Sequence, residues 1–111
     1  MGSPAASIYT ASVPLSVRQK KHLRRLAHPL EPIVMIGAGG ATDAVAAELD
    51  RALTAHELVK VGARLGDRGR RDAALAGLAA RTTSELVQRI GHVGVFYRRR
   101  KELPKIVIPD E

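Results

Sequence analysis

A short glycine-rich segment is the part of this sequence best suited to bind an anion. Gly37-Ala38-Gly39-Gly40 follows the apolar run 32–36 and precedes Thr42, a residue type that often caps helices. A glycine turn that ends a strand and opens a helix presents unpaired backbone N–H groups and the positive end of the helix dipole. Both favour phosphate, so residues 37–40 are predicted to contact phosphate groups.

The same glycines fit nucleotide-binding motifs poorly. A dinucleotide fingerprint requires glycine where Thr42 stands and an acidic residue where Arg64 and Leu65 stand. A Walker loop requires a Gly-Lys-Ser/Thr ending, which this segment lacks. A tight turn without a ligand remains an alternative, because glycine also permits turns for conformational reasons alone.

The distribution of charge indicates what kind of phosphate is bound. The chain has 111 residues, a formal net charge of +7 and a pI of about 10.6. Residues 16–28 carry five positive and no negative charges, and residues 64–105 carry eleven positive and four negative charges. Such blocks are typical of surfaces that bind polyanions. A surface that merely solubilises the protein is the alternative.

One predicted helix carries all five cations of the first basic block. Ser16 is a suitable N-cap, and Pro29 forces His28 out of helical geometry, so the helix is expected to end at about Ala27. Apolar side chains fall on one face of this helix. The opposite face is almost purely cationic, and its cations are expected to contact phosphates: Arg18, Lys20, Lys21, Arg24 and Arg25.

The remaining pattern predicts a small α/β domain. Strand 32–36 is expected to be buried on both sides, and strand 57–65 to be half-exposed, with Lys60 and Arg64 on its open side. The expected elements are helix 16–27, strand 32–36, a helix of about thirteen residues after Thr42, strand 57–65, a mobile basic loop 66–71, helix 71–81, and a hairpin of strands 86–90 and 93–97 around Gly91-His92.

This order, α-β-α-β-α-β-β, predicts a two-layer α/β fold with a small mixed four-stranded sheet. Residues 1–14 are uncharged and are expected to form a flexible leader. Ile106-Val107-Ile108 is a candidate edge strand, kept short by the flanking prolines. We expect cations from both ends of the chain to converge beside the glycine loop as one surface.

The end of the last strand supplies further candidate contacts. Arg98, Arg99 and Arg100 resemble a clamp for a phosphate backbone, although solvated side chains are an alternative. Tyr97 is a candidate platform for base stacking or, equally, a residue packed at the core boundary. Neighbouring strand residues point to opposite faces, so only one of Phe96 and Tyr97 is expected in the core. Lys60 and Arg64 either extend the surface or are simply exposed.

Enzyme chemistry finds no support in this sequence. It has no cysteine, and its histidines, at positions 22, 28, 56 and 92, are scattered; His56 is expected to be a hydrogen-bonded core residue. No nucleophile can be paired with a base, so no catalytic residue, metal or cofactor is expected. No apolar run approaches the roughly 20 residues needed to cross a bilayer. A soluble cytoplasmic protein without a membrane partner is therefore predicted.

Several separated blocks of the sequence also resemble a known family. They are Leu15-Ser16-Val17-Arg18-Gln19-Lys20-Lys21-His22-Leu23, Leu26-Ala27-His28-Pro29-Leu30 with Pro32, the loop 37–40, His56-Glu57-Leu58-Val59-Lys60-Val61, and Gln88-Arg89-Ile90-Gly91 followed by Tyr97-Arg98. In this order they resemble the CRM domain (chloroplast RNA splicing and ribosome maturation), in particular its stand-alone bacterial members of the YhbY type.

The resemblance implies a non-enzymatic RNA-binding module, with a fold similar to the C-terminal domain of bacterial translation initiation factor three. The domain would cover residues 15–103, followed by a tail over 104–111. Its partners would be precursor large-subunit ribosomal RNA and the pre-ribosomal particle, and we expect a monomer. A factor that binds ribosomes mainly through protein contacts is the alternative. Because Ala38-Gly39 lacks a polar side chain, the loop would contact phosphate through backbone N–H groups.

Overall fold

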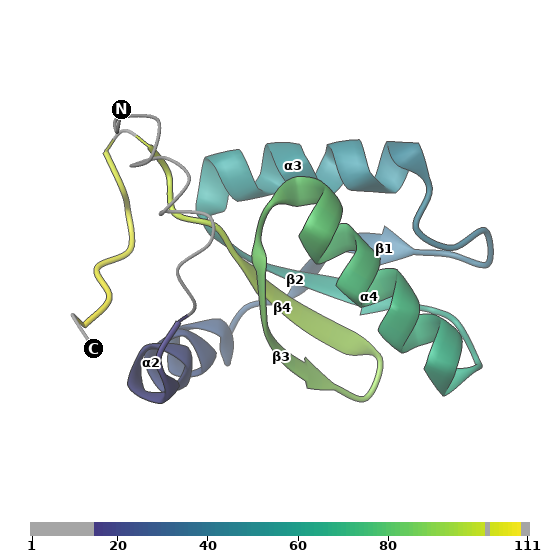
Figure 1. Cartoon of the computed structure of the whole chain (residues 1–111), viewed down its shortest axis with the longest axis horizontal. Helices are drawn as coiled ribbons and strands as arrows, with labels where there is room; N and C mark the ends of the chain where they lie inside the picture. Colours follow the sequence, from purple (N-terminus) through teal and green to yellow (C-terminus); the bar gives the residue numbers. More distant parts are fainter. Residues whose placement is uncertain (1–14, 102, 110–111) are drawn as a thin grey trace, which may run out of the picture.

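The structure, a computed structural model, describes residues 15–101 and 103–109, so the predicted leader lies outside the described residues. Four strands form one sheet in the order β1-β2-β4-β3 (Figure 1). β1 is parallel to β2, and β4 is antiparallel to both of its neighbours. The elements are α2 (Val17–Ala27), β1 (Pro32–Ile36), α3 (Asp43–His56), β2 (Leu58–Ala63), α4 (Arg68–Thr82), β3 (Glu85–Ile90) and β4 (Val93–Tyr97). The predicted α/β class, element order and mixed four-stranded sheet are confirmed.

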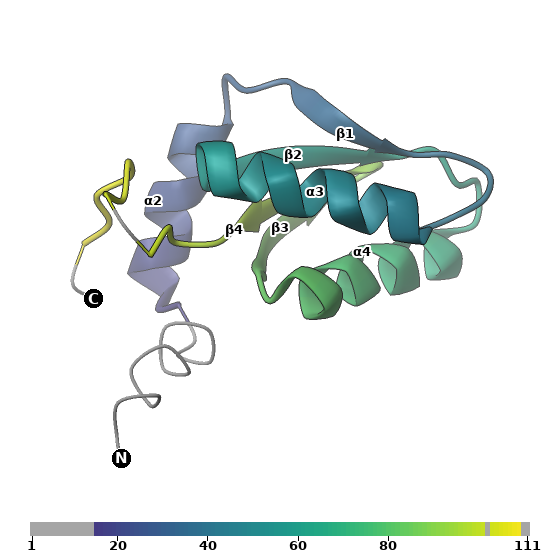
Figure 2. The ribbon, with the colours of Figure 1, turned by 90° about the horizontal axis from the view of Figure 1, so that it is seen from above.

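The main hydrophobic core lies between the sheet and the helices α3 and α4, which cover one of its faces (Figures 1 and 2). Leucines from both helices pack there against the β-branched residues of β1 and β2 and against Phe96 of β4. The fully buried side chains include Val34, Ile36, Leu49, Leu53, Val59, Val61, Leu75, Leu78 and Phe96. With few aromatic residues available, this core is built mainly from aliphatic side chains.

A second core lies on the opposite face of the sheet, where α2 packs across one end. Leu23 and Ala27 of α2 contact Tyr97 and neighbouring strand residues, and Ile106 and Ile108 pack against the same cluster. Both faces of β4 are therefore covered at this end, and Phe96 and Tyr97 are both buried. The prediction that only one of them is in the core was wrong, because it assumed that a single face of the sheet is covered.

Two predictions about strand burial were also wrong. β1 lies at the edge of the sheet, and its residues Ile33 and Met35 are 50% and 41% exposed, because no helix covers their side. β2 is buried along almost its whole length, because it is a central strand with the main core on one side. On its other side Leu58 packs in the second core, and the Met35 side chain lies over Gly62.

Helix α4 begins earlier than predicted. Asp67 is its N-cap, with Oδ2 accepting a hydrogen bond of 2.8 Å from the backbone N–H of Arg70. Arg68, Gly69 and Arg70 are therefore helical rather than part of a mobile loop. The glycines around Asp67 suggested a loop, and the capping role of this aspartate outweighs that tendency.

Glu57 joins the end of α3 to the C-terminal segment, residues 103–109. Its side chain is fully buried, and its carboxylate accepts hydrogen bonds from the backbone N–H groups of Lys105 and Ile106 (both 2.7 Å) and of Arg100 (2.8 Å). The neighbouring His56 is exposed, so its predicted place in the core was wrong. The chain turns at Glu57, with φ = 65°, so Glu57 rather than His56 faces inward.

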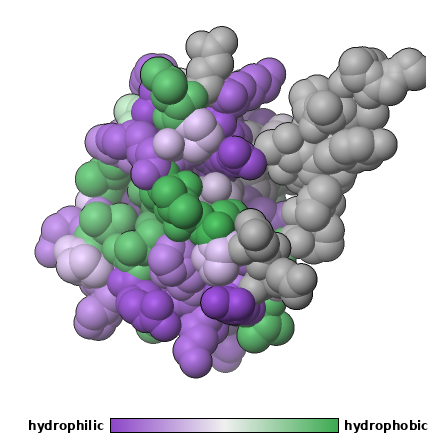
Figure 3. Space-filling view, turned by 90° about the vertical axis from the view of Figure 1, so that its left-hand side faces the viewer, coloured by the Kyte–Doolittle hydropathy of each residue, from purple (hydrophilic) through white to green (hydrophobic). Residues whose placement is uncertain are grey.

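The C-terminal segment lies along α2 and forms no strand between Ile106 and Ile108. Gln19 of α2 donates to the Pro109 carbonyl (2.8 Å), and His22 Nε2 lies 3.0 Å from the Val107 carbonyl oxygen. Figure 3 faces this end of the molecule, where hydrophobic surface lies between hydrophilic surfaces. None of the helices within the described residues combines the length and apolar composition needed to span a bilayer.

The other end of the sheet gathers three chain reversals. The Arg64 N–H donates to the Ile36 carbonyl (2.8 Å), which joins the end of β2 to the end of β1. The Ala63 N–H donates to the backbone carbonyl of His92 in the β3–β4 turn (2.6 Å). The glycine loop, the β2–α4 connection and the hairpin turn therefore share this end, and α2 lies at the opposite end (Figures 1 and 2).

Candidate nucleic-acid interface

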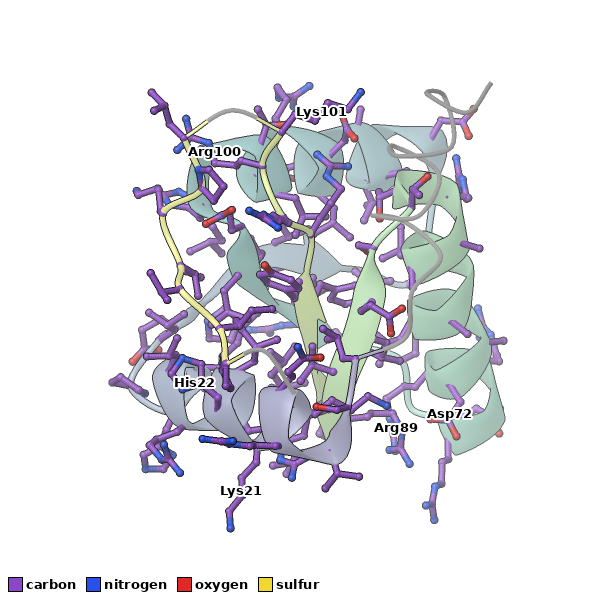
Figure 4. All side chains as sticks on the ribbon, turned by 60° about the vertical axis from the view of Figure 1, so that its left-hand side comes forward. Lys21, His22, Asp72, Arg89, Arg100 and Lys101 are labelled. Atoms are coloured by element: carbon purple, nitrogen blue, oxygen red, sulfur yellow. The ribbon has the colours of Figure 1, made fainter. Side chains whose placement is uncertain are left out.

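Helix α2 presents a cationic face to solvent. Its start is fixed by a capping box, in which Ser16 Oγ accepts from the Gln19 N–H and Gln19 Oε1 accepts from the Ser16 N–H. Its side chains Arg18, Lys21 and Arg25 are exposed, and Lys20 and Arg24 are half-buried. None of these five cations has an ion pair among the residues that the structure describes. Figure 4 shows Lys21 pointing away from the domain.

The glycine loop is an exposed turn at the start of α3. Gly40 N–H donates to the Gly37 carbonyl (2.9 Å), and Gly37, Ala38 and Gly39 are all exposed. Gly40 has φ = 82°, a conformation that side-chain-bearing residues rarely adopt. Thr42 caps α3 as predicted, because its Oγ1 accepts from the Val45 N–H at 3.2 Å. The geometry leaves the turn open to an approaching ligand.

One acidic residue stands at this helix N-terminus, and a cation offsets it. Asp43 in the first turn of α3 is paired with Arg81 of α4, which also donates to the Ala41 carbonyl (2.9 Å). Arg81 was not among the predicted site residues, because it is far from the loop along the chain. The pair reduces the repulsion that Asp43 would otherwise exert on a phosphate beside the loop.

Arginines from the β2–α4 connection lie at the same end of the molecule as the glycine loop. Arg64 directly follows β2, and Arg68 and Arg70 are in the first turn of α4. All three are exposed and without an ion pair among the described residues. Arg71 is instead held by the Leu65 and Gly66 carbonyls. Arg68 and Arg70 were missed as site residues, because they were assigned to a loop of unknown direction.

The cations of α2 do not lie beside the glycine loop. β1 leads from the α2 end of the sheet to the loop, so the two groups are at opposite ends of that strand (Figures 1 and 2). The expected single surface around the loop was therefore wrong. The open side of the sheet lies between them and carries Lys60, whose Nζ donates to the His28 carbonyl (3.4 Å).

Arg98 has a structural role. Its guanidinium donates to Asp50 Oδ1 (2.7 Å), the Thr82 carbonyl (2.8 Å) and Thr54 Oγ1 (2.9 Å), which ties β4 to α3 and α4. Its guanidinium is therefore engaged within the fold, in contrast to the free side chain that the predicted phosphate clamp assumed. Arg99 is exposed and Arg100 half-buried. Figure 4 shows Arg100 and Lys101 beside α3, far from Lys21 on α2.

Tyr97 is not available as a stacking platform in this structure. Its side chain is 5% exposed and packs in the second core. Burial raises the pKa of its phenol, the charge of Glu57 raises this pKa further, and Arg99 opposes the shift. Across residues 15–101 and 103–109, no three His, Asp or Glu side chains converge into a group able to hold a metal ion.

Comparisons with known proteins identify the relatives of this chain. It is 42% identical over 95 residues to an RNA-binding protein of Haemophilus influenzae, covering 86% of this chain and 95% of that protein. It is 36% identical to a Bacillus subtilis protein named probable RNA-binding protein YqeI, covering 86% of this chain and 99% of that protein. A Staphylococcus aureus protein, described as hypothetical and as a candidate RNA-binding protein, has a solution structure that matches with a TM-score of 0.76 and 38% identity, over 86% of this chain and 100% of that one.

The family model that matches is the CRS1 / YhbY (CRM) domain, and the match covers residues 15–98. These residues include α2, the glycine loop and all four strands. The chain therefore belongs to the CRS1/YhbY (CRM) domain family.

Proposed function

We propose that this protein is a non-enzymatic RNA-binding protein that acts in assembly of the large ribosomal subunit in the cytoplasm. In this proposal α2 and the loop end of the sheet each hold phosphates of the RNA. At the loop end, the phosphates contact the backbone of residues 37–40 together with Arg64, Arg68 and Arg70.

The cationic face of α2 is the observation that carries the proposal. Five positive side chains lie within three turns of helix, and no ion pair forms with them among the described residues. Like charges at i,i+4 spacing, such as Lys21 and Arg25, destabilise a helix slightly. A polyanion would remove this repulsion, and the names of the H. influenzae and B. subtilis relatives favour RNA as that polyanion.

Binding to naked RNA at increasing salt tests the proposal. Filter binding of a labelled ribosomal RNA fragment should weaken steeply as salt rises, because each phosphate contact releases counterions. Replacing Arg18, Lys21 and Arg25 together by alanine should reduce the slope of log affinity against log salt by about 2. The charge-conserving variant R18K/K21R/R25K is the control and should retain the slope.

Absence of binding to naked RNA, together with binding to ribosomal particles, would favour a factor that acts through protein contacts. The ribosomal role is tested separately by crosslinking in cells and sequencing of the bound RNA. We expect large-subunit ribosomal precursors to be enriched. Enrichment of unrelated transcripts would leave RNA binding in place and overturn the ribosomal role.

A further inference from the structure

The open side of the sheet forms a groove against α2 to which the proposed function assigns no role. The groove has a volume of about 280 Å³ and lies between the C-terminal half of α2 and strands β2, β3 and β4. Its floor is apolar, from Ile90, Val93 and Val95. The polar residues around it are Arg24, His28, Lys60 and Gln88.

The groove combines an apolar floor with groups that recognise a charged and polar ligand. Ile90 is 64% exposed, an unusual position for a large aliphatic side chain. The Gln88 amide has no hydrogen-bond partner among the described residues, and such an amide both donates and accepts hydrogen bonds. Among the residues that the structure describes, no acidic side chain lines the groove, whereas Arg24 and Lys60 supply positive charge.

The groove also lies between the two cation groups of the proposed RNA surface. Arg24 belongs to α2, and Val93 and Ile90 lie next to the hairpin turn, at the end of the sheet that carries Arg64 and the glycine loop. An RNA strand whose phosphates contact α2 at one end and Arg64 at the other must cross the open side of the sheet. Its bases then lie where the apolar floor is exposed.

We propose that this groove holds an unstacked base of single-stranded RNA. The flat faces of a base are apolar and match Ile90 and Val93, and its polar edge matches the Gln88 amide. Arg24 and Lys60 contact the flanking phosphates. The charge of the rim favours a nucleic acid over the apolar face of a partner protein. This inference rests on the proposed RNA binding and adds a base-dependent contact to it.

An oligonucleotide without bases separates this contact from phosphate binding. Fluorescence anisotropy compares a single-stranded RNA oligomer with an abasic oligomer of the same length and charge. We expect the wild-type protein to bind the base-containing oligomer roughly tenfold more tightly. I90S and Q88L should each reduce this preference several-fold and leave affinity for the abasic oligomer unchanged. V107S is the control, since Val107 is 84% exposed and lies outside the groove.

Each outcome has a distinct meaning. Equal wild-type affinity for both oligomers, or an undiminished preference in I90S and Q88L, would overturn the base site and leave phosphate binding intact. Failure to bind either oligomer would overturn the proposed function itself. Circular dichroism of both variants checks that they fold, and Ile90 is exposed enough that I90S is expected to melt at the wild-type temperature.

Discussion

At the scale of single residues, the Tyr97 hydroxyl is a polar group that the fold buries. No described residue lies within hydrogen-bond distance of its Oη. A buried polar group without a partner costs about 1–3 kcal/mol. Y97F is therefore expected to increase the free energy of unfolding by about 1 kcal/mol, measured by urea denaturation. A clear loss of stability in Y97F would show that the hydroxyl has a partner in solution.

The same residue predicts an alkaline limit to stability. Because the pKa of Tyr97 is raised in the folded protein from its usual value of 10.0, the unfolded chain releases this proton first. The Tyr97 phenol therefore makes its whole contribution to the free energy of unfolding below about pH 10. This contribution is lost as the pH rises through the pKa of Tyr97 in the folded protein. Y97F lacks this component. Between pH 8 and pH 11, the free energy of unfolding measured by urea denaturation should fall less in Y97F than in the wild type. Equal falls in the two proteins would contradict the raised pKa of Tyr97.

Side-chain roles were the least predictable part of the candidate site. The sequence placed Arg98 and Arg99 in one clamp, but Arg98 is bound to Asp50, Thr82 and Thr54 whereas Arg99 is exposed. These partners are 16 to 48 residues away along the chain, so local pattern carries no signal for them. By contrast, the cations of α2 were predictable, because an amphipathic helix has only one face that packs.

At the scale of elements, Glu57 fastens the C-terminal segment to the domain. E57Q keeps the shape of the side chain but replaces an acceptor oxygen with an NH₂ group, which cannot accept from Arg100, Lys105 or Ile106. We expect the free energy of unfolding to fall by about 2 kcal/mol, since hydrogen bonds to a buried charge are strong. Hydrogen exchange at the Lys105 and Ile106 amides should accelerate.

E48Q is the matched control for this prediction, because Glu48 is exposed on α3. It should change neither the stability nor the exchange rates. Unchanged exchange at Lys105 and Ile106 in E57Q would show that the segment is held by its apolar contacts with α2 instead.

The glycine loop is tested best at Gly39. A Cβ at this position would meet only Thr42 Cγ2, at an ordinary 3.8 Å, whereas a side chain at Gly40 is strained by its φ of 82°. G39D places a carboxylate at the proposed phosphate position and should weaken RNA binding several-fold. G39N has nearly the same shape without the charge and should bind like the wild type. Equal affinities for the two variants in filter binding would exclude this loop from the interface.

Element boundaries were predictable where caps and apolar runs coincide. Ser16 and Thr42 both cap helices as expected, and Pro32–Ile36 is a strand with the predicted bounds. The start of α4 was missed, because Gly69 suggested a loop and the cap at Asp67 was not recognised. Which faces of a strand are covered depends on distant elements, so the burial of β1 and β2 was not predictable from their own residues.

At the scale of the whole molecule, the separation of the two cation groups makes their contributions separable. The variants R18A/K21A/R25A and R64A/R68A/R70A should each weaken RNA binding. Combined, their effects on log affinity should add, because distant sites without shared contacts act independently. Filter binding with one RNA fragment measures the affinities of the two triple variants and of the combined variant. No effect of R64A/R68A/R70A would restrict the interface to α2.

The arrangement of these groups was not predictable, although their composition was. Two basic blocks are evident in the sequence, but their relative position depends on the direction of β1 across the domain and on the side of the sheet that α2 occupies. The pattern of apolar and turn residues predicted the fold class and the order of the elements along the chain. It did not indicate that a sheet surface lies between α2 and the loop.

The positive charges of α2 have a different consequence when no RNA is bound. Dissolved ions screen repulsion between neighbouring lysines and arginines, so moderate ionic strength should make the isolated protein harder to melt. The same ions compete with RNA for these side chains. Conditions that best preserve the purified protein during storage are therefore those in which its affinity for RNA is lowest.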